Sequence, residues 1–426
     1  MKKQLITTVT ALALATMSAG AYAKTELRMS WWGGNERHQA TNDALERFQK
    51  ANPDISVKAE YTGWDGALTR ITTQIAGNTE PDVMQTNLNW MPIFSKTGEG
   101  FYDMNKVKAD LHADNFSDSA LNTVTFGGKL NGVPVSMTSR VFYYNKETWS
   151  KAGIAYPTNW DELMAAGKTF KEKLGDEYYP IVIEARDVFA MNRSYMIQTT
   201  GKDIITQDGK LNYSQDEMTK FFELYTKQVE DHVFPSTKEY ASYGRSNLYE
   251  MRPWIEGKFG GVYMWDTAIT KYSDNLKPPM GLELAPYPMA PGAKDAGLLS
   301  RPSMMFSIGR NTKHPEEAAK LINFLLNDPV GVKALGLTRG IPLSAAGVKE
   351  LKSDGTIQES SLSFAGYNQA RSLPQTIVST PYTDNAQLMD IFSEEMQALD
   401  YGKSTPEQSA QEFLRKGKRI LARLTK

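Results

Sequence analysis

Two hydrophobic periods alternate along residues 27–86 of the chain. Residues 27–32 alternate as a strand, and the next apolar residues recur every three to four positions, as on one face of a helix. Asn35 stands where a helix N-cap is expected, and Asn52-Pro53 marks the end of that helix. The pattern predicts, in order, strand 27–32, helix 36–51, strand 55–61, helix 67–76 and strand 81–86. This β-α-β-α-β order predicts an α/β layer with short loops.

The remainder of the chain mixes the same two periods, without an internal repeat or a low-complexity linker. We expect strands over 131–135, 140–146, 180–184, 257–265 and 303–308, and helices over 160–174, 216–229, 315–326 and much of 383–424. Polar residues 136–139 separate the first two of these strands. Because no single position divides the sequence into two successive domains, it predicts segments that cross between two lobes.

The first 23 residues have the three parts of a secretory signal peptide. Lys2 and Lys3 are basic, residues 5–16 are mostly apolar, and Ala21-Tyr22-Ala23 is an A-x-A cleavage site. The apolar stretch is shorter than the ~20 residues that span a membrane, which disfavours an anchor. We therefore expect cleavage after Ala23 and an exported mature protein.

Composition narrows the function further. The 426 residues are 41% hydrophobic and 23% charged, as is typical of a globular protein. The formal net charge of −1 offers no broad positive surface, so we expect no nucleic-acid partner and no anionic membrane partner. The chain has no cysteine, which excludes disulfides, thiolate metal sites and cysteine nucleophiles. The four histidines lack metal-ligand spacing and no P-loop or dinucleotide motif occurs, so we expect no metal and no cofactor.

Six segments along the chain together resemble the extracellular solute-binding proteins of ATP-binding-cassette importers, in the sugar-binding family that includes maltodextrin-binding protein. The segments are LRMSWWGG (27–34), FQKANPDISV (48–57), EPDVMQTNLNW (80–90), LNGVPVSMTSRVFYYNKETWSKAGI (130–154) followed by PTNWDEL (157–163), EGKFGGVYMWD (256–266) and SMMFSIGRNTKHPEEAAKLINFLL (303–326). They occur in the family's order and span essentially the whole mature chain.

The resemblance implies a two-lobed periplasmic binding protein fold of the α/β class, with strand hinges and a ligand cleft between the lobes. Lobe one would hold residues 24–137 and 302–345, and lobe two would hold 138–301 and 346–426. It further implies a monomer that closes on a sugar and delivers it to an inner-membrane permease. Within the family, the sequence is similar in overall character to members that bind oligogalacturonides, the acidic fragments of pectin. Each galacturonate ring carries a carboxylate, so such a ligand requires Arg or Lys in the cleft.

Candidate ligand contacts in lobe one follow the carboxyl ends of its predicted strands, where α/β folds bind ligands. Indole rings can stack on a sugar face, and amides both donate to and accept from hydroxyls. The candidates are Trp32, Gly34, Asn35, Trp64, Asp65, Asn87, Asn89 and Trp90. Ordinary packing of the indoles and Asx-type turns at the asparagines are the alternative interpretations. Trp31 and Trp32 should point to opposite sides of their strand.

Further candidate contacts lie in lobe two, at the crossings between the lobes and in the turn at 338–342, and the family's topology places residues 186–194 at the cleft side of lobe two. These candidates are Thr138, Ser139, Arg140, Arg186, Asn192, Arg193, Met264, Trp265, Asp266, Arg301, Ser303 and Arg339. Residues 186–194 are expected in a loop after strand 180–184. Arg140 is the leading partner for a ligand carboxylate, against the alternative of a surface arginine at a hinge.

Two other functions remain open from the sequence alone. The ligand could be a neutral oligosaccharide, since the neutral side chains at Asn89 and Thr138 suit one as well. A secreted hydrolase or pectate lyase is the other alternative, because one sequence cannot exclude a pair of opposed carboxylates. A lyase of the parallel β-helix type would show short repeats, and none is present.

Overall fold

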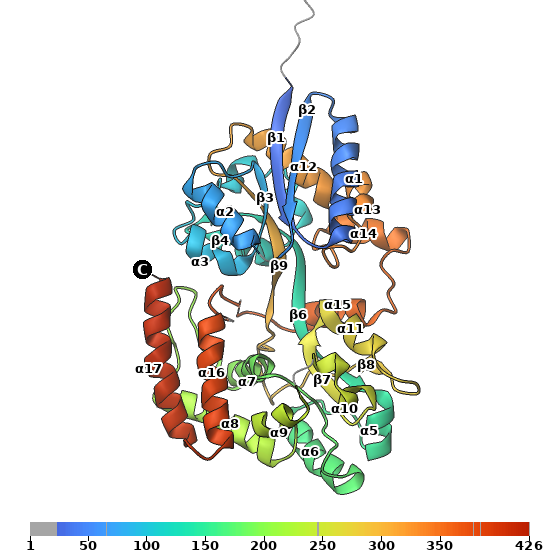
Figure 1. The fold of residues 1–426 in the computed structure, drawn as a ribbon, viewed down its shortest axis with the longest axis vertical. Helices are drawn as coiled ribbons and strands as arrows, with labels where there is room; N and C mark the ends of the chain where they lie inside the picture. Colours follow the sequence, from blue (N-terminus) through green and yellow to red (C-terminus); the bar gives the residue numbers. More distant parts are fainter. Residues whose placement is uncertain (1–23, 65, 245–246, 378, 384, 426) are drawn as a thin grey trace, which may run out of the picture.

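The computed structural model describes residues 24–64, 66–244, 247–377, 379–383 and 385–425. The chain forms two lobes, one above the other in Figure 1, and two long strands run between them. These strands are β6 (Val133–Asn145) and β9 (Ser300–Ile308), which pair antiparallel. The predicted two-lobed α/β fold is thereby confirmed. The expected signal peptide, residues 1–23, lies outside the described residues.

Lobe one is built on the strand order β2-β1-β3-β9-β6. Its elements are β1 (Thr25–Trp32), α1 (Asn35–Ala51), β2 (Ile55–Thr62), α2 (Ala67–Ala76), β3 (Val83–Thr86), α3 (Met91–Phe94), α4 (Asp118–Asn122), β4 (Thr125–Phe126), β5 (Lys129–Leu130), α12 (Pro315–Leu326) and α13 (Pro329–Leu335). Strand β1 pairs parallel with β2 and β3, and β3 pairs antiparallel with β9. Helix α1 packs against α12 and α13 beside this sheet.

Lobe two continues β6 into a second set of strands and a layer of helices. Its elements are α5 (Lys146–Ala152), α6 (Trp160–Leu174), α7 (Ala185–Thr200), α8 (Gln215–Glu230), α9 (Thr237–Ser242), α10 (Arg252–Ile255), β7 (Gly261–Trp265), α11 (Ile269–Asp274), β8 (Leu282–Leu284), α15 (Leu362–Ser372), α16 (Ala386–Asp400) and α17 (Pro406–Leu424). Helix α14 (Ala345–Ser353) lies on the third connection between the lobes. Five 3-10 turns complete the described elements, at Leu88–Trp90, Met104–Val107, Ala113–Asn115, Leu248–Glu250 and Asp266–Ala268.

Strand directions show which edge of lobe one faces lobe two. Strand β6 leaves lobe one at its carboxyl end, β9 returns antiparallel to it, and β3 is antiparallel to β9. Strands β1 and β2 run parallel to β3, so all three end at the edge nearest lobe two. The loops after these strands therefore face the space between the lobes.

Each lobe has its own hydrophobic core. The lobe-one core draws its residues from segments 27–135 and 304–343, and the lobe-two core from 141–299 and 370–421. A small third cluster joins α13, α14 and α15, where the chain crosses for the third time. Separate cores let two lobes move as units about the strands that connect them. Within the described residues, no helix combines the length and apolar composition that a membrane crossing requires.

Several local predictions need correction. Residues 131–135 and 140–146 are not two strands, because β6 runs unbroken through the polar segment 136–139. That segment stays in the ladder since its hydroxyls have partners: Ser136 Oγ lies 2.6 Å from the Arg339 carbonyl oxygen, to which it donates. The tail is two helices, α16 and α17, with a turn between them.

Two further corrections concern lobe two. Residues 180–184 form no regular strand, because the Ile181 and Val182 amides donate to two different segments instead of one ladder. Residues 186–194 are helical, not a loop, since they belong to α7.

Candidate functional site

Three tryptophans gather at the lobe-one edge that faces lobe two. Trp32 ends β1, and its ring centroid lies 5.3 Å from that of Trp64 and 4.9 Å from that of Trp90. Trp64 stacks on Trp90 with 5.8 Å between the centroids and 23° between the planes. Trp32 and Trp90 are buried, whereas Trp64 remains 56% exposed. Trp64 therefore offers a free indole surface on a rigid aromatic base, which suits a flat apolar ligand face.

The turns next to the tryptophan cluster are stabilised by hydrogen bonds between residues that are close in sequence. Trp31 faces away from the cluster and donates from Nε1 to His38 Nδ1 at 3.1 Å, so the two indoles do point to opposite sides. Asn35 does not cap α1: Gly34 takes the N-cap position and no side chain caps it, while Asn35 begins the helix. Asn87 accepts a hydrogen bond from the Asn89 amide at 3.1 Å, which is the Asx-type turn that the sequence left as an alternative.

The facing edge of lobe two carries arginines around one indole. The Arg140 guanidinium carbon lies 4.5 Å from the ring centroid of Trp265, and that of Arg301 lies 5.1 Å from it. Arg140 is 3% exposed and ion-paired with Asp187 near the N-terminus of α7. The positive charge of Arg140 is thus already balanced by a carboxylate of the protein, and Trp265 packs against cations on this edge.

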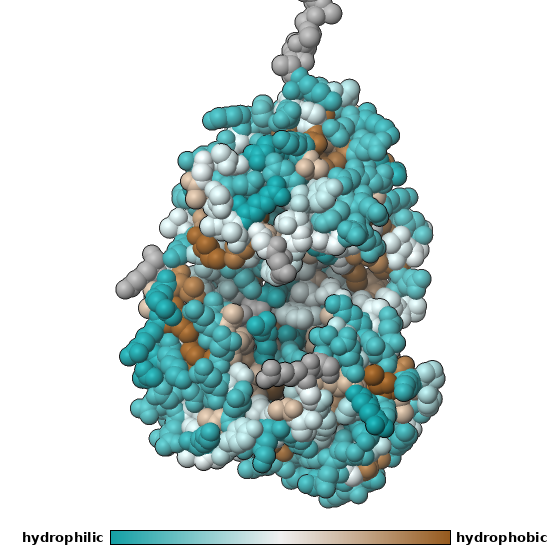
Figure 2. All heavy atoms as spheres, in the orientation of Figure 1, coloured by the Kyte–Doolittle hydropathy of each residue, from teal (hydrophilic) through white to brown (hydrophobic). Residues whose placement is uncertain are grey.

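The strand registers join the tryptophan cluster and the arginine cluster along one sheet. Trp32 and Thr86 lie two residues beyond the paired residues of β1 and β3, and Thr86 pairs with Met305. Between Met305 and Arg301 the pairing of β9 with β6 shifts register twice, so the alternation of side chains does not carry across this segment. Arg301 pairs with Thr138, the residue two before Arg140, so the two arginines share a face. Figure 2 shows the surface hollowed between the two lobes.

Charged side chains surround the start of α7 beside this cluster. Glu184 accepts from the Tyr240 hydroxyl at 3.3 Å and serves as the N-cap of α7 in a capping box with Asp187. Partial burial, followed by the nearby charge of Asp187, raises the pKa of Glu184. Arg186 is exposed on the first turn of the helix, where its guanidinium is open to solvent and to a ligand.

Asp266 occupies the edge of β6 where the lobes join. It is 2% exposed, and one carboxylate oxygen accepts from Thr138 Oγ1 at 2.9 Å, from the Ser139 amide at 3.2 Å and from the Thr267 amide at 2.7 Å. Burial raises its pKa to about 6, although these hydrogen bonds act in the opposite direction. The residue links the crossing strand β6 to the end of β7.

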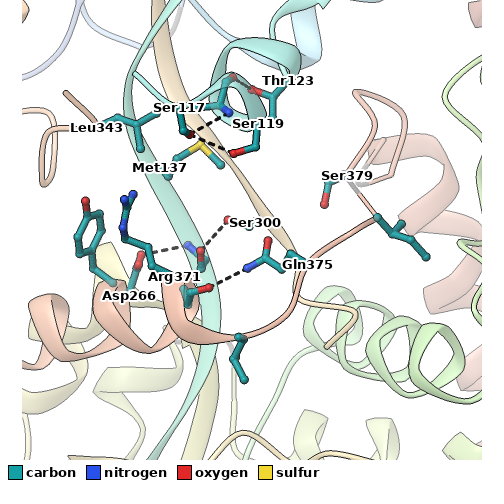
Figure 3. Close-up of a pocket in the computed structure, with 16 residues that line it drawn as sticks. Ser117, Ser119, Thr123, Met137, Asp266, Ser300, Leu343, Arg371, Gln375 and Ser379 are labelled. Atoms are coloured by element: carbon teal, nitrogen blue, oxygen red, sulfur yellow. Dashed lines mark hydrogen bonds between the residues drawn. The ribbon is translucent and has the colours of Figure 1, made fainter. Parts of the chain in front are cut away.

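A cavity of about 340 Å³ lies on the other face of β6, lined by Met137 and Ser139. Figure 3 shows Ser117, Ser119 and Thr123 of lobe one above this cavity, with Asp266, Arg371 and Gln375 of lobe two below it and β6 crossing between. Since Met137 and Ser139 alternate with Arg140, the cavity lies on the other face of β6 from Arg140.

Several predicted contact residues lie in the interior of a lobe. Asn192 and Arg193 are fully buried in lobe two, and Arg193 makes a two-fold ion pair with Asp203 at 2.8 and 2.6 Å. Met264 is 8% exposed in β7, and Arg339 is 3% exposed in lobe one. These positions favour structural roles, and a direct contact of any of them with ligand stays a prediction.

The remaining candidates lie at the edges of the lobes or outside the described residues. Gly34 is exposed beside α1, and Ser303 contacts Ser136 on the crossing strands. Asp65 lies outside the described residues.

Sequence reasoning missed Asp187 and Arg37. The spacing of Glu184 and Asp187 before an apolar run is a capping-box signal that could have identified the start of α7. No local signal identifies Arg37, whose partners are the carbonyl oxygens of Trp32 and of Thr338, three hundred and one positions away. Within the described part of the chain, no three His, Asp or Glu side chains are grouped as a metal site would require.

Comparisons with known proteins agree with this architecture. The sequence profile described as bacterial extracellular solute-binding protein matches residues 34–332. A periplasmic oligogalacturonide-binding protein from Yersinia enterocolitica is 54% identical, with a TM-score of 0.91 over 94% of this chain and 100% of that one. The same protein in complex with saturated digalacturonic acid is 55% identical, with a TM-score of 0.80 over the same shares.

A third similar structure is a de novo designed cysteine esterase, which is 54% identical with a TM-score of 0.93 over 95% of this chain and 100% of that one. The profile match covers well over half of the chain and agrees with the two lobes described above. The protein therefore belongs to the bacterial extracellular solute-binding protein family.

Proposed function

We propose that the mature protein is a periplasmic binding protein that captures oligogalacturonides between its lobes and delivers them to an ATP-binding-cassette permease. The observation that carries this proposal is the 54% identity, over 94% of the chain, to a periplasmic oligogalacturonide-binding protein. The signal peptide expected at residues 1–23 supports export. The protein would act as a monomer and bind the ligand in the cleft between its lobes. Binding would require no cofactor and no metal.

The tryptophan cluster and the arginine cluster together suit an acidic sugar. Trp64 supplies an exposed ring in lobe one, and Arg186 supplies an exposed cation at the start of α7 in lobe two. Arg301 lies against the half-buried Trp265 on the same lobe-two edge. A sugar ring stacks through its apolar face, and its carboxylate pairs with a guanidinium. A ligand that spans both clusters stabilises the form in which the lobes are close together.

The similarity scores support a lobe arrangement that differs from that of the ligand complex. Identity to the Yersinia protein is nearly the same in its two structures, at 54% and 55%, and the TM-score is 0.91 to one structure and 0.80 to the one with saturated digalacturonic acid. A lower score at equal identity is what a change in lobe arrangement produces. We infer closure by rotation of lobe one (24–137 and 302–345) against lobe two (138–301 and 346–426) about β6 and β9.

The alternatives differ in what they require. An enzyme of the cysteine esterase type needs a thiol nucleophile, and this chain has no cysteine. A neutral oligosaccharide would use the same indole platform but would bring no carboxylate to the exposed Arg186. Acidic ligands are therefore favoured over neutral ones, and binding is favoured over catalysis.

Titration calorimetry tests the proposal directly. Digalacturonate and trigalacturonate should bind, whereas maltotriose and galactose should show little or no heat. Tight binding of a neutral sugar, with none of a uronate, would reject the acidic ligand. Incubation with oligogalacturonide followed by assays for new reducing ends and unsaturated products tests the absence of catalysis, and either product would reject a purely binding role.

A further inference from the structure

Buried arginines differ in how their charge is balanced. Among the described residues, three arginines are at least nine-tenths buried: Arg140, Arg193 and Arg339. The first two are ion-paired with aspartates of lobe two. Arg339 has only neutral acceptors in lobe one, Gln85 Oε1 at 2.9 Å from its Nε and Thr41 Oγ1 at 3.0 Å from its Nη2. Its Nη1 is buried and finds no acceptor in the described structure.

A second arginine adjoins it through shared partners. Arg37 is half-buried and donates from Nη1 to the Trp32 carbonyl oxygen at 3.1 Å, an oxygen that Gln85 Nε2 also approaches at 3.2 Å. Gln85 therefore links Arg37 to Arg339 at the last residue of β1. In the part of the chain that the structure describes, no carboxylate oxygen lies within 4.0 Å of either guanidinium.

The charged forms of Arg37 and Arg339 are destabilised where no anion is close to them. Burial lowers the pKa of Arg339 well below its usual value, and the positive charge of Arg37 lowers it further. Burial, and then the positive charges of the same two arginines, lower the pKa of the adjacent His38. The nearest acidic side chain in sequence, Glu36, is exposed on the first turn of α1. Uncompensated buried charge costs free energy, which an incoming anion would recover.

The turn above the pair fits this arrangement. A Cβ at Gly33 would lie 2.6 Å from Arg37 Cδ, so glycine lets the arginine pack directly under the turn. No side chain caps α1 at Gly34, which leaves the first backbone N–H groups of this seventeen-residue helix open at the lobe edge. These N–H groups and the two guanidiniums present positive charge on the same turn.

We propose that Arg37 and Arg339 determine the specificity of lobe one for anionic sugars, acting through the turn 32–35 without touching the ligand. The proposal rests on the proposed uronide-binding function and extends it. It assigns to lobe one a share in the selection of carboxylates, beside the exposed Arg186 of lobe two, and leaves Arg140 chiefly paired with Asp187. A carboxylate at the turn would gain attraction that a neutral ester could not.

Calorimetry with digalacturonate and its dimethyl ester separates charge from shape. We expect Arg37→Gln and Arg339→Gln each to weaken binding of the acid about tenfold, the size of an interaction over several ångströms in a partly buried site. Binding of the ester should change by less than about twofold. Arg47→Gln is the matched control, because Arg47 is exposed on the same helix and pairs with Asp43. Thermal unfolding of each variant verifies that it is folded.

Each outcome has a distinct meaning. Equal losses for acid and ester, or no loss for the acid, would overturn the role of the two arginines. Failure of the unsubstituted protein to bind digalacturonate would instead overturn the proposed function. Should Arg339→Gln fail to fold, the half-buried Arg37→Gln decides the question alone.

Discussion

The two lobes bury arginines in opposite ways. In lobe two, Arg193 is fully buried and its two-fold pair with Asp203 offsets burial, so that the pKa of Arg193 is raised. In lobe one, Arg339 is almost as buried, but its partners among the described residues are an amide, a hydroxyl and the ring of Phe306, and its pKa is lowered. An arginine that is ion-paired with an aspartate stabilises the core of its lobe. An arginine without a carboxylate partner can still attract the carboxylate of a ligand.

The aromatic residues repeat this division. Lobe one stacks Trp64 on Trp90 and leaves the outer indole exposed, while lobe two places guanidiniums against Trp265. A ring stacked on another ring presents an apolar surface that is indifferent to ligand charge. The ring of Trp265, which packs against Arg140 and Arg301, instead positions the two guanidiniums. The comparison thus assigns shape recognition and charge recognition to different side chains.

The largest effect should come from removing the balance in lobe two. Asp203→Asn leaves Arg193 buried without a carboxylate and should reduce the free energy of unfolding by about 3–5 kcal/mol. Arg339→Met in lobe one should cost less, at most about 1–3 kcal/mol, because it leaves only neutral acceptors unpaired and also removes a buried charge that no carboxylate balances. Urea unfolding followed by tryptophan fluorescence measures both. Equal losses in the free energy of unfolding would show that Arg193 and Arg339 contribute to stability in the same way. That result would contradict the proposed difference between the two lobes.

The next largest effect concerns the stability contribution of Asp266, a buried carboxylate of lobe two that has no ion-pair partner in the described part of the chain. Asp266 accepts three hydrogen bonds but has no cation within 4.0 Å among the described residues, and burial raises its pKa from 3.8 to about 6. The folded protein therefore holds this proton more tightly than the unfolded chain does. Above pH 6 the ionised, buried carboxylate lowers stability by up to about 3 kcal/mol, and this cost disappears as the pH falls toward 4.

Asp266→Asn removes that titration and tests the sign. The stability of the variant relative to the original protein should rise between pH 4 and pH 7, measured by urea unfolding at each pH. Asp43→Asn, at an exposed carboxyl of α1, serves as the control. A relative stability that is flat or falls over this range would show that Asp266 is not a strained acid.

A smaller effect on binding tests the role of the ring in lobe two. Trp265→Ala removes the surface against which Arg140 and Arg301 pack, at 4.5 and 5.1 Å. Affinity for digalacturonate should fall about tenfold, roughly 1.4 kcal/mol, and affinity for the dimethyl ester about threefold. Titration calorimetry with both ligands measures the difference. If the ester loses as much as the acid, Trp265 acts by stacking on the sugar itself, as the sequence first suggested.

Local patterns predicted much of the fold, while long-range pairing limited the prediction of the site. Helices α2, α6 and α12 begin and end where the hydrophobic period placed them. Their signals are local, as at α6, where Asn159 caps the helix. The crossing strand β6 was divided in two, since its polar segment is recognisable as strand only when its partners on β9 are known.

The tryptophan cluster and the arginine pairs show the same limit at the site. Parallel strands end at one edge, so strand-end tryptophans could be expected near each other, and Trp32, Trp64 and Trp90 do meet. Arg140 could not be recognised as paired, because Asp187 is 47 positions away. Pattern alone also cannot distinguish the buried Arg193 from the exposed Arg186 on the same helix.

The smallest effect should come from the exposed indole of lobe one. Trp64→Ala removes a ring that is 56% exposed and stacked on Trp90, which costs a bound sugar about 1 kcal/mol of stacking. Because stacking is indifferent to charge, the affinities for digalacturonate and its dimethyl ester should both fall about fivefold in calorimetry. Tyr401→Ala is the control, at an aromatic side chain that is 53% exposed beyond the end of α16. If only the affinity for digalacturonate falls, Trp64 would be acting through Arg37 and Arg339 and not by stacking on the sugar. Lobe one would then not recognise the shape and the charge of the ligand with different side chains.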